Sequence, residues 1–332
     1  MPEPTGPVPT QTLPVYPAAG FVVTEGVARG DGLSFADDLV LDDIYQLTDG
    51  ALRGRLGLAV NEAAPGFLIA EGSELGRVGN PVYLDCCITL MAPDSTTYEG
   101  LVLVEVEAGT AAATYLLPLA TLARDTPYRL VRVDREVAPS RLATVACVSF
   151  TRGTHITLWS GAQVRIEDLN IGDRVLTRDD GAQAVRWIGQ TTLRATGAFS
   201  PIVIRKGTLH NTNDLLVSPD HRLFVYQRSD HLGAGRAEVL VKVRHLVNGD
   251  TVAVQDGGFI DYFQLLFDEH QIIYAEGIAA ESLLIDPRTR AALPDDVAGH
   301  GHGYRQHQDY EVHEGLLMRP DTVALLRRAS SG

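Results

Sequence analysis

Cysteine and lysine are both scarce in this chain of 332 residues. It has three cysteines, of which Cys86 and Cys87 are adjacent and Cys147 stands alone. This pattern excludes a disulfide framework, and no Cys-x-x-Cys pair indicates a zinc site. Cys86 and Cys87 lie in an apolar, strand-like run, so we expect two small hydrophobic side chains in a β core. The only lysines are Lys206 and Lys242, which we attribute to genomic composition.

Long apolar segments are also missing from the sequence. No run of about 18 apolar residues occurs, so we expect no transmembrane helix. The N-terminus has neither the basic region nor the apolar region of a secretory signal, so we expect no cleaved signal peptide. Export by a signal-independent route stays open, and the protein would otherwise be cytoplasmic.

Basic residues are also fewer than acidic residues. The chain carries 42 acidic and 28 basic residues, for a net charge of −14. Residues 1–146 hold 19 of the acidic and 9 of the basic side chains, so most of the imbalance lies there. Because an acidic surface repels phosphate groups and anionic lipids, we predict no nucleic-acid partner and no membrane partner.

The length predicts two domains, and their composition differs. Residues 1–19 contain six prolines, which predicts an extended, disordered tail. Residues 20–135 contain strand-like runs such as 100–107 between turn signals, so we predict a β sandwich or barrel of unknown role. Residues 136–146 contain a Pro-Ser turn and then small side chains, which is typical of a linker.

Beyond position 147 the sequence alternates short β-branched runs with Gly-Asp turns and contains an internal repeat. The pattern Leu-x-x-Gly-Asp-x-Val-x-x-x-Asp occurs at 169–179 and again at 246–256, an offset of 77 residues. Five matches in register predict two copies of a β unit related by a pseudo-twofold axis. Cys147 and His221 precede the two copies by 22 and 25 residues, so we expect them to face each other.

Three blocks in this region resemble the Hint domain, the module shared by hedgehog autoprocessing domains and inteins. The first block begins at Cys147, the second is Leu216-Val-Ser-Pro-Asp-His-Arg222, and the third runs from Gln264 to Gly277. The match is most similar to the bacterial intein-like branch. It implies an all-β, pseudo-twofold domain over residues 147–285, followed by a C-terminal tail over 286–332.

The resemblance also implies a self-processing reaction. Cys147 would attack the carbonyl of Ala146, and the N–S acyl shift would leave a thioester that water, an amine or a thiol resolves. The departing nitrogen needs a proton, and His221 is suited to supply it. Ser218 replaces the family's threonine and would hydrogen-bond the scissile peptide or orient the ring. His270 either assists a later step or only packs.

Departures from the family narrow this chemistry. Inteins end in His-Asn before the final junction, whereas residues 279–282 read Ala-Ala-Glu-Ser, so we do not expect splicing. Hedgehog-type domains carry an aspartate that activates a sterol, but residues 188–193 have no carboxylate, so sterol transfer is not supported. Gln264 stands where many relatives carry Asp or His. We therefore expect cleavage at the Ala146–Cys147 bond, with the chain's own N-terminal domain as substrate and no cofactor or metal.

Two other interpretations stay open. One is a secreted or surface structural protein whose Hint scaffold is catalytically silent, in which case the chain stays intact. The other is a metal-binding module built from histidines of the C-terminal tail, namely His300, His302, His307 and His313. The Gly-flanked His-x-His pair there has no obvious third ligand, which is more typical of a flexible linker.

Overall fold

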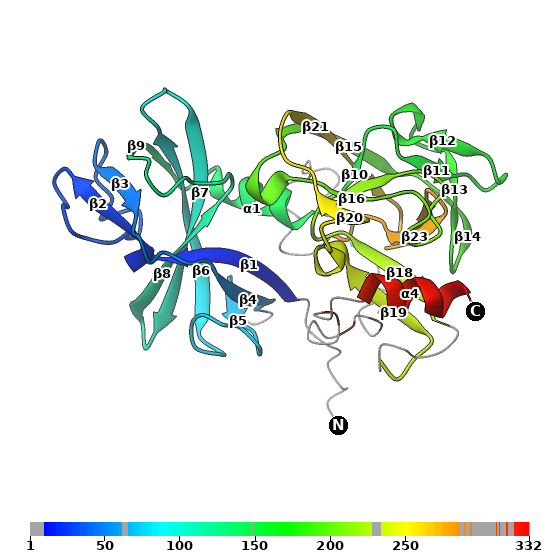
Figure 1. Ribbon diagram of the computed structural model, residues 1–332, viewed down its shortest axis with the longest axis horizontal. Helices are drawn as coiled ribbons and strands as arrows, with labels where there is room; N and C mark the ends of the chain where they lie inside the picture. The colour runs from blue at the N-terminus through cyan, green and yellow to red at the C-terminus, as the bar shows by residue number, and fades with distance from the viewer. Residues whose placement is uncertain are drawn as a thin grey trace. The chain divides into compact units, whose positions relative to one another are not determined.

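The computed structural model describes residues 10–61, 66–147, 149–227, 234–285 and 322–331, together with Thr289, Leu293, Tyr310, Val312 and Leu317. The chain divides into two compact units, residues 1–145 and 146–332 (Figure 1). Most described elements are strands, and the α-helices among the described residues, α1 (Ala138–Ala146) and α4 (Thr322–Ser331), are short. The prediction of an all-β protein is confirmed.

Six strands of the first unit form a closed barrel. They are β1 (Thr10–Pro17), β4 (Gly54–Val60), β5 (Phe67–Ile69), β6 (Pro81–Met91), β7 (Thr97–Glu107) and β8 (Thr110–Pro118). Their order is β6-β5-β4-β1-β8-β7, and the pairing of β6 with β7 closes the ring. Of the two architectures considered for this region, the structure therefore has the barrel.

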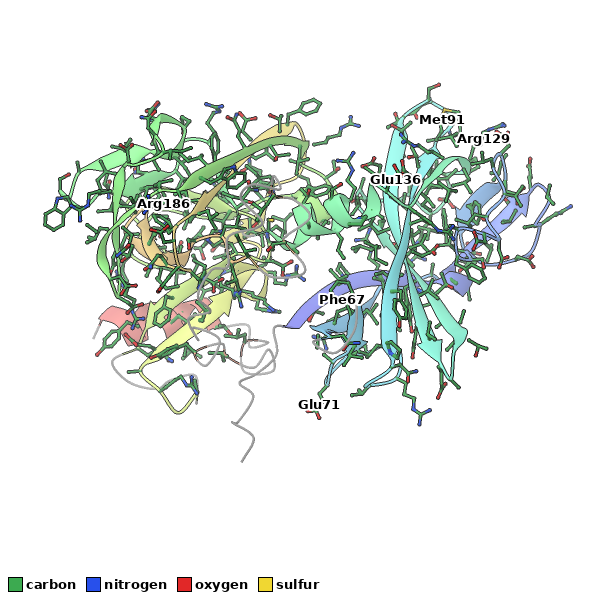
Figure 2. The ribbon with its side chains drawn as sticks, turned by 180° about the vertical axis from the view of Figure 1, so that it is seen from behind. Phe67, Glu71, Met91, Arg129, Glu136 and Arg186 are labelled. Atoms are coloured by element: carbon green, nitrogen blue, oxygen red, sulfur yellow. The ribbon has the colours of Figure 1, made fainter. Side chains whose placement is uncertain are left out.

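A three-stranded extension continues from the second half of β6. It consists of β9 (Tyr128–Asp134), β3 (Ile44–Leu47) and β2 (Phe21–Glu25), and the short 3-10 helix η1 (Ala18–Gly20) precedes β2. β6 can serve both parts because it has 11 residues: Val82 pairs with β5, whereas Met91 pairs with Arg129 of β9. Met91 and Arg129 accordingly lie at the same end of the unit (Figure 2).

The adjacent cysteines Cys86 and Cys87 lie in the core of this unit. Cys86 is 0% exposed and Cys87 2% exposed, as expected for small hydrophobic side chains in a sheet. Burial raises the pKa of the Cys87 thiol to about 11 and raises the pKa of Cys86 as well. Since the thiolate is the nucleophilic form, neither side chain competes with Cys147 for chemistry.

The N-terminal segment differs from its prediction. The sequence predicts a disordered tail over residues 1–19, but residues 10–17 form strand β1, which pairs with β4 and β8 inside the barrel. Leu13 and Val15 are both fully buried, whereas Pro14 between them is exposed. This alternation has the two-residue period of a strand, and the high proline count hides it.

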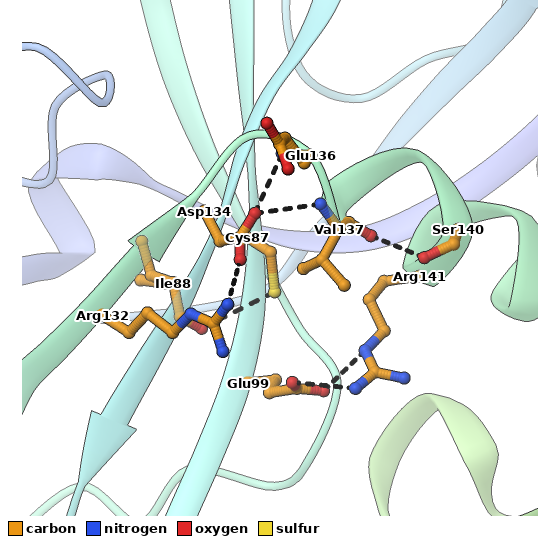
Figure 3. A network of polar contacts seen from close by, with 9 residues as sticks. All are labelled: Cys87, Ile88, Glu99, Arg132, Asp134, Glu136, Val137, Ser140 and Arg141. Carbon is orange, nitrogen blue, oxygen red and sulfur yellow. Dashed lines mark hydrogen bonds and ion pairs between the residues drawn. The ribbon is translucent and has the colours of Figure 1, made fainter.

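The predicted linker over residues 136–146 also differs, because most of it forms helix α1. Asp134 accepts backbone N–H hydrogen bonds at the start of the helix, and Arg141 forms an ion pair with Glu99 of β7, 3.0 Å from Nε to Oε2 (Figure 3). Pro139 lies in the first turn, where a missing N–H costs no helical hydrogen bond. The segment before Cys147 is therefore a helix attached to the barrel.

The second unit contains two sheets. The six-stranded sheet has the order β15 (Trp187–Arg194), β21 (Phe259–Leu266), β10 (Phe150–Thr151), β17 (Leu215–Val217), β16 (Ile202–Ile204), β20 (Val252–Val254). The other has the order β12 (Gln163–Arg165), β11 (His155–Thr157), β22 (Ile272–Ala275), β23 (Ile278–Glu281), β18 (Arg222–Tyr226), β19 (Glu238–Lys242). The hairpin β13 (Arg174–Thr177) and β14 (Gly181–Ala184) joins the second sheet at β22.

The internal repeat of the sequence recurs in the local structure of this unit. The 3-10 helix η2 (Ile166–Asp168) and its counterpart η4 (Val243–Leu246) begin 77 residues apart; a third, η3 (Gly197–Phe199), precedes β16. Each copy continues through a glycine of positive φ, 96° at Gly172 and 76° at Gly249. Each then enters a strand with a fully buried valine. Because glycine adopts this φ without strain, the shared Gly-Asp turns mark two copies of one unit.

The region predicted as a C-terminal tail is only partly described. Leu317 and two side chains of α4, Val323 and Leu326, pack in the core of the second unit, which differs from a free tail. The four histidines considered for metal binding lie outside the described residues.

Candidate functional site

The proposed scissile bond lies at the end of helix α1. Ala146 is the last residue of the helix, and its carbonyl is among those that a helix leaves without an intrahelical partner. Cys147 follows and is 2% exposed. Its side chain belongs to an apolar cluster with Leu266, Leu283 and Leu293, against which Trp187 and Ile285 also pack. The thiol is therefore enclosed mainly by hydrocarbon.

Two serine hydroxyls meet at the carbonyl of Cys147. Ser218 Oγ lies 3.4 Å and Ser149 Oγ 3.5 Å from that carbonyl oxygen, both as weak donors. Ser149 N donates to Ser218 Oγ at 3.0 Å, and Ser218 N donates to the Ser149 carbonyl at 2.9 Å. These contacts join the second sequence block to the residues that follow the scissile bond.

Gln264 of β21 holds one of these hydroxyls in place. Its Nε2 donates to Ser149 Oγ at 2.8 Å, and both side chains are buried. The sequence marks Gln264 only as a departure from the family and gives no role to Ser149. Only the positions of these residues in the sequence could have indicated a role. Gln264 is the first residue of the third block, and Ser149 is the third residue of the first block.

His221 lies beside the same segment and is fully buried. Its Nδ1 is 3.1 Å from the Ser149 carbonyl, and since a carbonyl only accepts, we assign the ring proton to Nδ1. Nε2 then carries the lone pair, and it meets no aligned hydrogen-bond partner among the described residues. The ring also packs on Phe150, with centroids 4.4 Å apart. His221 therefore presents a buried basic nitrogen.

Burial sets the charge of His221. Desolvation lowers its pKa to about 4, the charge of Arg222 lowers it further, and the carbonyls of Ser149 and Glu281 oppose the shift. The ring is therefore neutral at pH 7 and suited to accept a proton. A histidine of ordinary pKa near 6.5 would be partly charged there.

This low pKa predicts a loss of stability in acid. Because the unfolded chain protonates His221 near pH 6.5 and the folded chain near pH 4, stability falls as the pH drops through that window. We expect His221 to account for about 2 kcal/mol of the stability lost between pH 7 and pH 4.5. Urea unfolding at pH 7 and pH 4.5 measures this loss, which should be smaller in His221→Gln than in the wild type by about 2 kcal/mol. An equal loss of unfolding free energy in both proteins would contradict the low pKa of His221.

The turn that carries Ser218 and His221 is fixed to η4. Val243 N donates to the His221 carbonyl at 2.9 Å, and Arg244 N donates to the carbonyl of Pro219 at 3.0 Å. The side chains of Arg244 and Asp220 form an ion pair. An element of the internal repeat therefore positions the second block.

His270 lies in a different group of side chains. It follows β21, is 3% exposed, and its Nε2 is 3.6 Å from Oε1 of Glu281 at the end of β23. Arg222 Nε donates to Oε2 of the same carboxylate at 2.6 Å. The sequence gives no role to Arg222 or Glu281, although Arg222 directly follows His221.

A family model supports the resemblance. The model described as the Hint domain matches residues 148–287. Residues 148–287 are a Hint domain. The prediction of such a domain is therefore confirmed, and the repeat, the buried cysteine and the Ser218–His221 turn all belong to it or border it.

Solved structures similar to the chain include inteins. The Ssp DnaB mini-intein variant M86 is 11% identical, covering 42% of this chain and 96% of its own, with a TM-score of 0.29. The bacterial intein-like domain from Clostridium thermocellum is 13% identical, with coverages of 40% and 97% and a TM-score of 0.27. The gp41-1 intein is 12% identical, with coverages of 40% and 97% and a TM-score of 0.25. A search of curated proteins finds no match.

The described residues hold no metal-ligand cluster and no membrane-spanning helix. Within the described ranges, no group of three or more His, Cys, Asp or Glu side chains is arranged to hold a metal ion. In the same part of the chain, no helix is long and apolar enough to cross a membrane.

Proposed function

We propose that the Hint domain cleaves its own chain at the Ala146–Cys147 bond through a thioester. The contacts just after the scissile bond carry this proposal. Ser218 is hydrogen-bonded to Cys147 and Ser149, and His221 is hydrogen-bonded to Ser149, although both lie about 70 residues away in sequence. In this proposal a nucleophile, a basic imidazole and two hydroxyl groups act at one peptide junction.

In the first step, the thiol of Cys147 adds to the carbonyl carbon of Ala146 while His221 Nε2 takes the thiol proton. A tetrahedral intermediate forms, and the imidazolium returns the proton to the peptide nitrogen. The C–N bond then breaks, leaving a thioester at Ala146 and a free amine on Cys147. The contacts of Ser218 and Ser149 with the Cys147 carbonyl would fix the orientation of the nucleophile during this step.

In the second step, a nucleophile resolves the thioester. Water would give a carboxylate at Ala146, and an amine would give a new amide. The Ala-Ala-Glu-Ser sequence at residues 279–282 lacks the asparagine that cyclises in splicing, so we propose cleavage rather than ligation. The released piece is residues 1–146, and the barrel is thereby the substrate in cis.

A silent scaffold is the second candidate. The apolar cluster around Cys147, a residue that is only 2% exposed, favours it because water or an amine would have to displace those side chains to reach a thioester there. This protein would then be a secreted or surface structural protein with an unreacted Hint domain.

Hydroxylamine separates these two functions, because it reacts rapidly with thioesters. We expect it to release residues 1–146 as a hydroxamate from the wild-type protein and to release nothing from Cys147→Ala. Cys86→Ala serves as the matched control and should react like the wild type, since Cys86 is buried in the other unit. A wild-type chain that stays intact would support the silent scaffold.

A further inference from the structure

The Hint domain buries a cluster of ionisable side chains that the first step does not use. Arg222, His270 and Glu281 are 7%, 3% and 1% exposed. Glu281 lies between the other two, 2.6 Å from Arg222 and 3.6 Å from His270. Burying such a cluster costs desolvation energy, whereas apolar side chains of similar size would be buried without that cost. Its presence is therefore weak evidence for a purely stabilising role.

The cluster adjoins the reacting centre on two sides. Glu281 ends β23, and its carbonyl interacts with the His221 ring. Two residues later, Leu283 packs against Cys147, and Leu283 N is hydrogen-bonded to the carbonyl of Leu265 at 2.9 Å. The strand that carries Glu281 therefore leads directly to the thiol.

The segment that carries His270 reaches the same place. Leu266, four residues before His270, is in the apolar cluster around Cys147. β23 is also paired with β22, which begins just after His270, and Ser282 N donates to the Gln271 carbonyl at 2.8 Å. Both partners of the His270–Glu281 pair are thus attached to segments that contact Cys147.

We infer that this cluster serves the second step of the proposed function: His270 is the base that resolves the thioester, and Glu281, held by Arg222, is its positioning residue. This inference rests on thioester formation at Ala146. The carboxylate fixes the His270 ring with one nitrogen toward it and stabilises the positive charge that the ring acquires. His221 thereby transfers the proton in thioester formation, and His270 transfers the proton in thioester resolution.

The resolving step balances with water as the nucleophile. The water oxygen adds to the Ala146 carbonyl carbon while His270 takes one of its protons. The tetrahedral intermediate collapses, the C–S bond breaks, and the imidazolium returns that proton to the sulfur of Cys147. The products are the Ala146 carboxylic acid, which ionises, and the free thiol, so no oxidant or metal is required.

The test uses Glu281→Gln in the full chain and two assays. Dithiothreitol supplies its own nucleophile, so cleavage in its presence reports the first step, whereas cleavage without thiol also needs the resolving step. We expect Glu281→Gln to slow thiol-free cleavage by about 10- to 100-fold, less than the roughly 10²- to 10⁴-fold typical of a lost acid–base group because His270 itself is kept, and to change dithiothreitol cleavage by less than about threefold. His270→Gln should give the same pattern, and it carries the test if Glu281→Gln does not fold.

Glu276→Gln is the matched control. Glu276 is 1% exposed and also pairs with a histidine, His155, 2.8 Å from Nδ1 to Oε1. Its substitution should leave the ratio of the two rates unchanged. Because Glu281 acts through His270, Glu281→Gln should have no further effect on resolution in a His270→Gln background.

Three results would overturn the inference. They are an equal loss in both assays for Glu281→Gln, additive losses in the double variant, and a wild type that cleaves with dithiothreitol but never without it. No cleavage of the wild type with dithiothreitol would instead contradict the proposed function.

Discussion

Replacing His221 with glutamine should slow dithiothreitol-induced cleavage at pH 7 by about 10²- to 10⁴-fold, the range typical of a lost acid–base group. Glutamine keeps a similar length and an N–H that can donate to the Ser149 carbonyl, as Nδ1 of His221 does at 3.1 Å. It has no basic nitrogen to replace Nε2, so it removes the proton transfer while preserving the turn. Reverse-phase separation of the fragments over time measures the rate.

His155→Gln is the control for this prediction. His155 lies in the same domain, but its ring is bonded to Glu276 and not to the residues around Cys147. We expect its rate to stay within about twofold of the wild type, as for substitutions away from a site. Cleavage of His221→Gln at the wild-type rate, or an equal loss in His155→Gln, would exclude His221 as the proton carrier.

Replacing Cys147 with alanine should abolish cleavage altogether. No thioester forms without the sulfur, and no second thiol replaces it, because the other cysteines lie in the first unit and burial raises their pKa. Cys87→Ala should cleave like the wild type. Any cleavage of Cys147→Ala at the Ala146–Cys147 bond would require another mechanism.

The Cys147→Ala substitution should leave the fold intact, and thermal unfolding verifies this. Cys147 packs among leucines, so loss of one sulfur costs about 1 kcal/mol, far less than total stability. Thermal unfolding of Cys147→Ala should therefore resemble that of the wild type. A variant that does not fold would make its inactivity uninformative, and Cys147→Ser would then replace it.

The sequence indicates the Hint domain well, because its signals are local. The Gly-Asp turns require glycine at positive φ, and Gly172 and Gly249 adopt it 77 residues apart. The block around Ser218 and His221 likewise resembles the family's second block, and the structure places this block against Ser149. Such repeated local patterns can be recognised in the sequence without knowledge of tertiary contacts.

Features that depend on tertiary packing could not be predicted in this way. Strand β1 is proline-rich, and only its place between β4 and β8 makes Leu13 and Val15 core residues. The Glu281–Arg222 pair spans 59 positions and depends on the register of β18 against β23. The neutral state of His221 also depends on complete burial, which no local pattern specifies.

Intact-mass measurement is the most direct test of whether Cys147 reacts with the peptide bond before it. The purified wild-type protein is incubated with dithiothreitol beside Cys147→Ala. We predict two new masses in the wild type alone, corresponding to residues 1–146 bearing a dithiothreitol thioester or its hydrolysis product, and to residues 147–332. A wild-type chain that retains its full mass through a long incubation, or a C-terminal fragment that begins at a residue other than Cys147, would show that Cys147 does not react with this bond.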